Sequence, residues 1–168
     1  MGAEYRHFGL IGHPVAHSGS AQYFEEKWRA RGIEGCRYTL HDLSNLTSLV
    51  ALWESRTWSG MNVTVPHKQS VMPFLDGLSP EAEAIGAVNT IAFTEAGRIG
   101  HNTDAVGFRR AIAPFLEGRQ DRALVLGTGG SSAAVVHVLR TIGIDVTRVS
   151  RNPCLLYTSP SPRDFTES

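Results

Sequence analysis

The sequence has little of several features that would assign a protein class at once. Its 168 residues include only two cysteines, Cys36 and Cys154, too few for a disulfide framework. The 16 Lys and Arg residues balance 16 Asp and Glu residues, so no large one-signed field exists to hold nucleic acid or an anionic membrane. The N-terminal residues lack the basic start and long apolar run of a signal peptide. We therefore expect a cytoplasmic protein without a nucleic-acid or membrane partner.

What the sequence does contain is the composition of an ordinary globular α/β protein. Hydrophobic residues make up 42% and aromatic residues 8%, with 17 Gly and 8 Pro, so the chain can build a core. Because domains commonly have about 100–200 residues, the chain is either one complete domain or part of a larger protein. The motifs described below favour the second interpretation.

The first half alternates between strand and helix patterns. A short apolar strand at 8–12 ends in a turn, and an amphipathic helix is expected from about 20 to 31. Further strands are expected at 36–43 and 60–66 and within a β pair at 87–102, and further helices at 46–55, 67–76 and 80–85. This alternation predicts one α/β unit with a mainly parallel sheet.

The second half reads as the start of a dinucleotide-binding domain. A helix-compatible stretch at 104–118 leads to a strand at 123–127, a helix at 130–142 and a strand at 145–149. Between the first of these strands and its helix lies Gly127-Thr128-Gly129-Gly130, where backbone N–H groups could approach a pyrophosphate. A glycine turn without a ligand is the alternative, because Ser132 replaces the third glycine of the usual fingerprint.

The end of the second strand indicates which dinucleotide is bound. An acidic residue there favours NAD, whereas an arginine accommodates the 2′-phosphate of NADP. The sequence has Ser150-Arg151-Asn152 at this place, and Asp145 lies at the other end of the strand. Arg151 therefore predicts NADP, with an ordinary surface arginine as the alternative. No metal ion is expected.

Three polar motifs in loops are candidates for binding and chemistry. Ser18 and Ser20 could donate together to a carboxylate, although Ser20 could also be a helix N-cap. Lys68, after the strand that Pro66 ends, could exchange a proton with a substrate hydroxyl, or be a solvated lysine at a helix start. Asp104, where the halves join, could orient that lysine, or simply stabilise a helix N-terminus.

These motifs, in this order, resemble the shikimate dehydrogenase family. The matching segments are GLIGHPVAHSGS (9–20), GMNVTVPHK (60–68), IGAVNTI (85–91), HNTDAVGF (101–108), VLGTGGSSAA (125–134) and SRN (150–152). The resemblance implies reduction of 3-dehydroshikimate to shikimate with NADPH. It also implies an N-terminal α/β substrate domain at 1–103, followed by an incomplete Rossmann NADP-binding domain at 104–152.

The resemblance also assigns roles to individual residues. Lys68 and Asp104 would form the catalytic pair, in which Lys68 gives a proton to the carbonyl oxygen. Substrate binding would fall to Ser18, Ser20, Thr64, Asn89 and Asp104. Cofactor binding would fall to Gly127, Thr128, Gly129, Gly130, Ser131, Ser150, Arg151 and Asn152. The family pattern implies a monomer or homodimer that acts on a small molecule.

The sequence departs from the family pattern in several places. Ala21 stands where many relatives have proline, and Ser-Arg-Asn replaces the usual Asn-Arg-Thr. The remaining Rossmann strands and the C-terminal helices are absent, so we expect a truncated chain with little or no turnover. Residues 153–168 break the βαβ rhythm and would be a polar tail, and residues 154–164 resemble a translated sequencing adapter.

Two other functions stay open at this point. A quinate or aminoshikimate dehydrogenase of the same superfamily could use the same catalytic pair on a different ring. A fragment that binds ligand without catalysis is the alternative from another class. The joint presence of Lys68 and Asp104 favours an enzyme, because a pure sensor would not need both.

Overall fold

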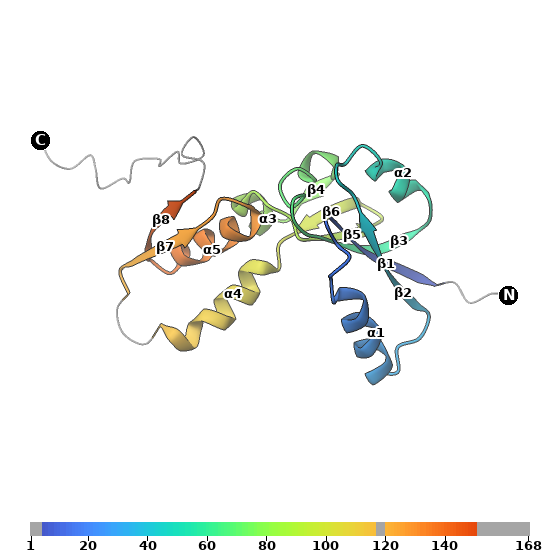
Figure 1. Cartoon of the computed structure of the whole chain (residues 1–168), viewed down its shortest axis with the longest axis horizontal. Coiled ribbons are helices and arrows are strands. Elements are labelled where there is room, and N and C mark those ends of the chain that lie inside the picture. Colours follow the sequence, from blue (N-terminus) through green and yellow to red (C-terminus); the bar gives the residue numbers. More distant parts are fainter. Residues whose placement is uncertain (1–4, 117–119, 151–168) are drawn as a thin grey trace, which may run out of the picture.

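The structure of the chain, a computed structural model, describes residues 5–116 and 120–150 and forms two lobes (Figure 1). The elements of the first lobe are β1 (Arg6–Gly12), α1 (Ser20–Ala30), β2 (Cys36–Asp42), α2 (Leu49–Glu54), β3 (Trp58–Val63), a 3₁₀ turn (Met72–Phe74), β4 (Gly77–Leu78), α3 (Pro80–Ile85), β5 (Thr90–Thr94) and β6 (Gly97–His101). Those of the second lobe are α4 (Asp104–Ile112), a 3₁₀ turn (Ala113–Phe115), β7 (Arg122–Leu126), α5 (Gly130–Thr141) and β8 (Asp145–Val149).

The first lobe is built on a six-stranded sheet in the order β2-β1-β3-β5-β6-β4. Strand β1 pairs in parallel with both β2 and β3, and β4 pairs in parallel with β6. The two antiparallel pairings are those of β5 with β6, which form a hairpin, and of β5 with β3. The predicted α/β fold with a mainly parallel sheet is therefore confirmed, with an antiparallel hairpin added.

Both faces of this sheet are covered, which explains the amphipathic patterns of the helices. On one face, Ile11, Met61 and Ile91 form a buried cluster with Leu49 and Trp53 of α2. On the other face, α1 covers a smaller cluster around Leu10 and Tyr38, and Figure 1 shows α1 and α2 on opposite sides. This double cover fixes the sheet on which the loops of the site are built.

Residues 67–76 do not form the helix that the sequence predicts. They form turns, the 3₁₀ turn Met72–Phe74, and the approach to β4. Pro73 has no N–H, and its ring would clash with the carbonyl four residues earlier, so an α-helix cannot pass through it. Buried His67 donates from Nε2 to the carbonyl oxygen of Leu43 at 2.6 Å, which fixes the first turn.

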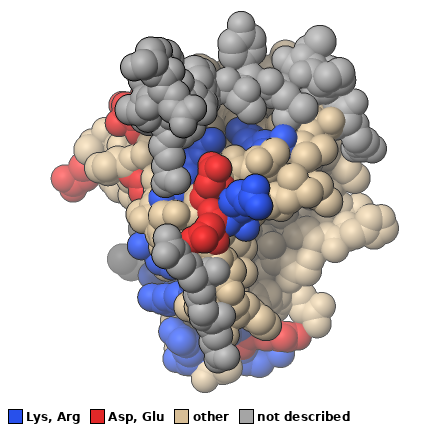
Figure 2. Space-filling view, turned by 90° about the vertical axis from the view of Figure 1, so that its left-hand side faces the viewer, with Lys and Arg blue, Asp and Glu red and all other residues tan. Residues whose placement is uncertain are grey.

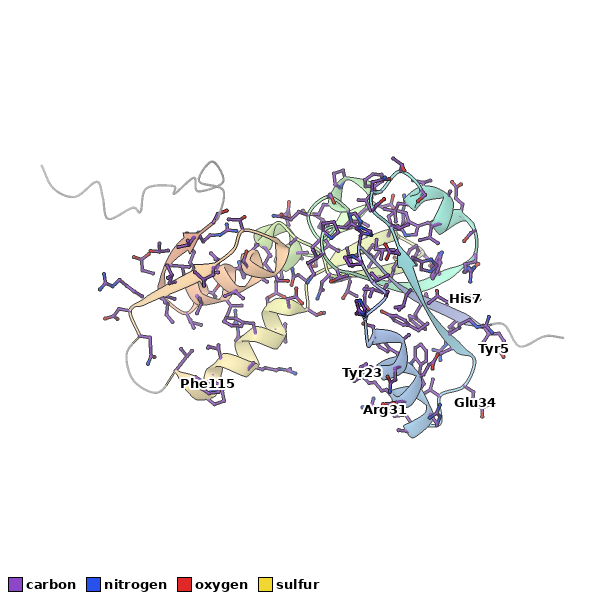
Figure 3. The ribbon with its side chains drawn as sticks, in the orientation of Figure 1. Tyr5, His7, Tyr23, Arg31, Glu34 and Phe115 are labelled. Carbon is purple, nitrogen blue, oxygen red and sulfur yellow. The ribbon has the colours of Figure 1, made fainter. Side chains whose placement is uncertain are left out.

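The second lobe has a two-stranded parallel sheet covered on one side by α5. Val125 and Val146 pack beneath this helix. On the opposite side, Leu124 and Leu126 are 63% and 76% exposed. Phe115, near the outer end of α4, is 76% exposed (Figure 3). In the described part of the chain, this two-stranded sheet therefore leaves an apolar surface open on the side away from α5.

The surface carries both charges, as the balanced composition implies. Figure 2 shows acidic and basic side chains beside one another on the end of the second lobe. No helix in residues 5–116 or 120–150 is long and apolar enough to cross a membrane.

An ion pair joins the approach to β4 with β6. Arg98 donates from Nε to Asp76 Oδ2 at 2.7 Å and from Nη2 to Oδ1 at 2.8 Å. Its backbone N–H donates to the same carboxylate at 2.8 Å, and its guanidinium lies 4.9 Å from the centre of the Trp53 ring. These hydrogen bonds hold the pKa of Asp76 well below its usual range.

This depressed pKa predicts an acid-dependent contribution to stability. The carboxylate of Asp76 binds a proton more weakly in the folded state than in the unfolded state. Its contribution to stability is therefore complete above the pKa of the unfolded state, which is about 4, and is lost as the pH falls toward the lower pKa of the folded state. Asp76→Asn should therefore lower the urea midpoint at neutral pH and make it less sensitive to acid. An Asp76→Asn variant whose midpoint falls with acid as steeply as that of the wild type would contradict this. Asp145→Asn, at an exposed position in the other lobe, is the control.

Candidate active site

The candidate site lies where the carboxyl ends of two parallel strands meet the start of the second lobe. Ser18 and Ser20 follow β1, and Thr64 and Lys68 follow β3. Because β1 and β3 are parallel neighbours, these loops emerge at the same edge of the sheet. Asp104 begins α4 directly after β6, so the topology brings the second lobe to the same edge.

Lys68 forms the central contact of the site. Its Nζ donates to Asp104 Oδ2 at 2.7 Å and to Ser131 Oγ at 3.0 Å. Its side chain is only 11% exposed, and that of Asp104 is 30% exposed. The alternative of a solvated lysine at a helix start is therefore wrong, because the side chain is largely buried and no helix begins there. Partial burial strengthens the attraction between the two charges.

Asn89 holds the other oxygen of Asp104. Its Nδ2 donates to Asp104 Oδ1 at 2.8 Å and to Thr103 Oγ1 at 2.9 Å. Its Oδ1 accepts from the backbone N–H of Thr103 at 2.9 Å. Because both ends of the amide are engaged, the carboxylate of Asp104 has one preferred orientation toward Lys68.

Asn102 fixes the backbone from which Asp104 projects. This 3% exposed side chain accepts at Oδ1 from the N–H groups of Asp104 and Ala105, at 3.0 and 3.4 Å. Its Nδ2 donates to the carbonyl oxygen of Ala87 at 2.9 Å. Asp104 is thus the first residue of α4, where a helix N-terminus stabilises a carboxylate, in addition to being the partner of Lys68.

The two serines lie together at the start of α1. Ser18 Oγ donates to Ser20 Oγ at 3.1 Å and accepts from the backbone N–H of Ser20 at 3.3 Å. Gly19 is the N-cap, so the alternative role of Ser20 as N-cap is wrong. The loop before them is tied to β2, because Asp42 contacts His13 Nδ1 at 2.5 Å and accepts from the N–H of Val15 at 3.2 Å.

Thr64 packs against β1 because Gly12 has no side chain. A Cβ at Gly12 would lie 2.3 Å from Thr64 Cγ2 and 2.9 Å from the carbonyl oxygen of Val65. The N–H of Thr64 donates to the carbonyl oxygen of Ile11 at 2.9 Å, so the loop after β3 stays close to β1. This approach keeps the loops that carry Thr64 and Ser18 next to one another.

The glycine-rich turn packs directly on the loop of Lys68. A Cβ at Gly130 would lie 2.6 Å from Lys68 Cβ, whereas a Cβ at Gly127 or Gly129 would meet no atom within 4 Å. Gly127 also has a φ of 114°, which favours glycine. Open space beside bare backbone at the start of α5 fits a pyrophosphate, which a helix N-terminus binds well.

The remaining residues that the sequence predicts to bind a cofactor lie only partly within the described part of the chain. Thr128 lies in the same turn, Ser131 contacts Lys68, and Ser150 follows β8. Arg151, Asn152 and the expected tail at 153–168 lie outside the described residues. Within the described part of the chain, no group of three or more His, Cys, Asp or Glu side chains could hold a metal ion.

Two further polar residues of the site were not among those predicted. Tyr38 is 5% exposed and donates from its hydroxyl to Asn62 Oδ1 at 2.8 Å. Burial raises the pKa of Tyr38 to about 12, so its hydroxyl keeps its proton. In the sequence, an aromatic residue within a strand is typical of ordinary core packing. Only the structure, which brings Asn62 to the hydroxyl, shows that Tyr38 also makes a polar contact.

Fold and site together define a two-lobed α/β protein in which a lysine–aspartate pair faces the glycine-rich turn of a dinucleotide-binding unit. Residues 10–91 match the family model described as "Shikimate dehydrogenase substrate binding domain". The chain therefore belongs to the shikimate dehydrogenase family.

Individual relatives agree with this assignment. The shikimate dehydrogenase (NADP(+)) of Exiguobacterium sibiricum is 40% identical over 134 residues, which are 79% of this chain and 50% of that protein. The crystal structure of shikimate dehydrogenase from Aquifex aeolicus matches with a TM-score of 0.82 and 33% identity, covering 92% of this chain and 59% of that one. The Thermus thermophilus enzyme in complex with NADP(H) and shikimate matches with a TM-score of 0.78 and 38% identity, covering 89% and 57%. The chain spans about half the length of the curated relatives it matches.

The contact between Gly130 and Lys68 gives a direct test of how the lobes meet. Gly130→Ala should lower the free energy of unfolding by about 1–3 kcal/mol, because the added methyl group overpacks against Lys68 Cβ. Gly129→Ala is the matched control, since it adds the same group one residue earlier into open space. Urea unfolding measures both variants. Equal stability of the two variants would contradict the described contact between the lobes.

Proposed function

We propose that these residues belong to an enzyme that reduces 3-dehydroshikimate to shikimate with NADPH. The observation that carries this proposal is the Lys68–Asp104 pair held against the glycine-rich turn, with two serine hydroxyls at the same sheet edge. The names of the relatives support it, as does the similarity to an enzyme solved with NADP(H) and shikimate. We further propose a substrate domain at 1–103, a partial cofactor domain at 104–152, a cytoplasmic location, and a monomer or homodimer.

Substrate binding falls to hydroxyl and amide groups that suit an acidic, polyhydroxylated ring. Ser18 and Ser20 donate to the substrate carboxylate and thereby exchange their mutual contact for stronger, charge-assisted hydrogen bonds. Thr64 and Asn89 contact the ring hydroxyls. Because Asn89 already orients Asp104, the same amide sets the position of the substrate and of the catalytic pair.

The chemical step needs a proton at the carbonyl oxygen. NADPH, when bound, supplies the hydride to the carbonyl carbon. As negative charge develops on the oxygen, the Lys68 ammonium group stabilises it and transfers a proton, so the C=O becomes a C–H and an O–H. Asp104 keeps Lys68 in place through the 2.7 Å contact, and it balances the charge of the ammonium group before transfer.

The cofactor is held by backbone and by small side chains. Gly127, Thr128, Gly129, Gly130 and Ser131 accommodate the pyrophosphate at the start of α5, where the space beside Gly127 and Gly129 is open. Ser150, Arg151 and Asn152 receive the adenosine 2′-phosphate. An arginine at this place rather than an acidic residue is the feature that selects NADP.

Binding of shikimate to the 168-residue chain tests the substrate assignment. Replacing Ser18 and Ser20 together by alanine should weaken shikimate binding about 100-fold, since each hydrogen bond to a charged group contributes about 1.5 kcal/mol or more. Isothermal titration calorimetry measures the dissociation constant. Ser44→Ala, at an exposed loop position, is the control. A chain that prefers quinate, or a double variant that binds as the wild type does, would contradict the assignment.

The open apolar surface of the second lobe leads to a separate expectation for turnover. With Leu124 and Leu126 exposed on a two-stranded sheet, this lobe holds the cofactor less firmly than a full Rossmann sheet does. The 168-residue chain should therefore oxidise shikimate with NADP⁺ far more slowly than the Exiguobacterium sibiricum relative. Parallel assays by nicotinamide absorbance measure both rates, and equal rates would contradict this expectation.

A further inference from the structure

A series of side-chain hydrogen bonds connects Tyr38 with the Lys68–Asp104 pair. It passes through the side chains of Tyr38, Asn62, Thr90, Asn89, Asp104 and Lys68. These residues come from β2, β3 and β5, from the loops after β3 and before β5, and from the start of α4. The series therefore runs across the sheet from β2 to the start of α4.

The donors between Tyr38 and Asp104 all point the same way. Ser18 donates to Ser20 at 3.1 Å. Burial raises the pKa of the Tyr38 hydroxyl, and the nearby Ser20 side chain opposes that rise. Tyr38 donates its own proton to Asn62 Oδ1 at 2.8 Å. Hydrogen bonds arranged head to tail polarise one another, so a change at one end is felt along the series.

The second part of the series continues to the carboxylate. Asn62 Nδ2 donates to Thr90 Oγ1 at 3.4 Å, which is the longest contact of the series. Thr90 donates to Asn89 Oδ1 at 3.1 Å, and Asn89 Nδ2 donates to Asp104 Oδ1 at 2.8 Å. Asn62 Nδ2 also donates to the carbonyl oxygen of Asn89 at 3.5 Å. Because a carbonyl oxygen can only accept, the amide has its nitrogen on this side and its oxygen toward Tyr38.

Tyr38 is the buried centre of this series and is held rigidly. Phe24 stacks on its ring at 4.8 Å between centroids, with 13° between the planes, and Trp28 lies 6.5 Å away. With 5% exposure, Tyr38 is shielded from solvent, so its hydroxyl depends on protein partners. Its hydrogen bond to Asn62 gives the hydroxyl a role that packing alone does not require.

We propose that Tyr38 is a positioning residue that orients the Lys68–Asp104 pair through Asn62, Thr90 and Asn89. This proposal rests on the proposed function for the identity of the ligand whose binding is measured. Without the hydroxyl, Asn62 Oδ1 lacks its buried donor, so the side chains that follow Asn62 in the series are held less firmly. Asn89, which is the last of these side chains before Asp104, then fixes the carboxylate of Asp104 less well.

The first experiment compares two tyrosines that lie on the same side of the sheet. Tyr38→Phe keeps the stacked ring and removes only the hydroxyl. Tyr23→Phe removes a hydroxyl from an exposed tyrosine of α1, whose ring is 55% exposed (Figure 3). Calorimetry should show about tenfold weaker shikimate binding by Tyr38→Phe, the size expected for a lost buried hydrogen bond. Unchanged binding by Tyr23→Phe is expected, and unchanged binding by Tyr38→Phe overturns the proposal.

A double-mutant cycle separates coupling from local damage. Thr90→Val interrupts the series beyond Asn62 while keeping the size of the side chain. If the series acts as a unit, Tyr38→Phe combined with Thr90→Val should bind shikimate no more than about tenfold more weakly than the wild type. If the two fold-changes multiply, the residues act independently and the proposal is overturned.

A measurement without ligand keeps the test separate from the identity of the substrate. The side-chain amide resonances of Asn89 in ¹⁵N NMR spectra should shift in Tyr38→Phe, although Tyr38 does not contact Asn89 directly. They should stay in place in Tyr23→Phe. If the wild-type chain does not bind shikimate, the proposed function fails, but the change in the Asn89 resonances still tests the role of Tyr38. Asn89 resonances that are unchanged in Tyr38→Phe overturn the proposal for Tyr38.

Discussion

The ion pair between Lys68 and Asp104 is the contact on which the arrangement of the site depends. It joins the loop after β3 to the start of α4, and therefore joins the two lobes. A partly buried pair of charges is costly unless its remaining hydrogen-bonding groups are satisfied. Ser131 contacts the ammonium group and Asn89 contacts the second carboxylate oxygen, so the surrounding residues offset that cost.

Two glycines make this arrangement sterically feasible. Gly12 lets the loop of Thr64 lie against β1, and Gly130 lets the start of α5 lie against Lys68. At each position a Cβ would lie within 2.6 Å of a neighbouring carbon atom, so close approach of the backbone rather than turn geometry explains the glycine. The loops of Thr64 and Lys68 and the glycine-rich turn thus meet over a short distance, as the proposed hydride transfer would require.

Much of the fold could be predicted from periodicity and turn residues. Apart from the two-residue strand β4, the strands of the first lobe and the βαβ unit of the second follow apolar runs that glycine or proline bounds, and the structure has them. No sequence pattern indicated β4. The prediction of a helix at 67–76 is wrong because Pro73, which has no backbone N–H, prevents an α-helix there. The antiparallel β5–β6 hairpin was expected as a pair, but its place beside β3 depends on tertiary packing.

The site could be predicted only in part, for reasons of chemistry. Lys68, Asp104 and the serines stand out because charged and hydroxyl residues occur in loops where the backbone does not need them. Tyr38 and Asn62 lie within strands, where their residue types are compatible with ordinary packing. Their role depends on which side chains three separate strands bring together, and no local pattern contains that information.

The location of bound shikimate is the most direct test of the proposed site. Nuclear Overhauser effects between the ring protons of shikimate and an isotope-labelled chain would identify the side chains within a few ångströms of the ligand. The expected contacts are to Ser18, Thr64 and Lys68, which lie in loops that the parallel strands bring to one edge. Contacts confined to the separate surface cleft beside Tyr5 and Trp28, which has a volume of about 790 Å³, would contradict the proposed site.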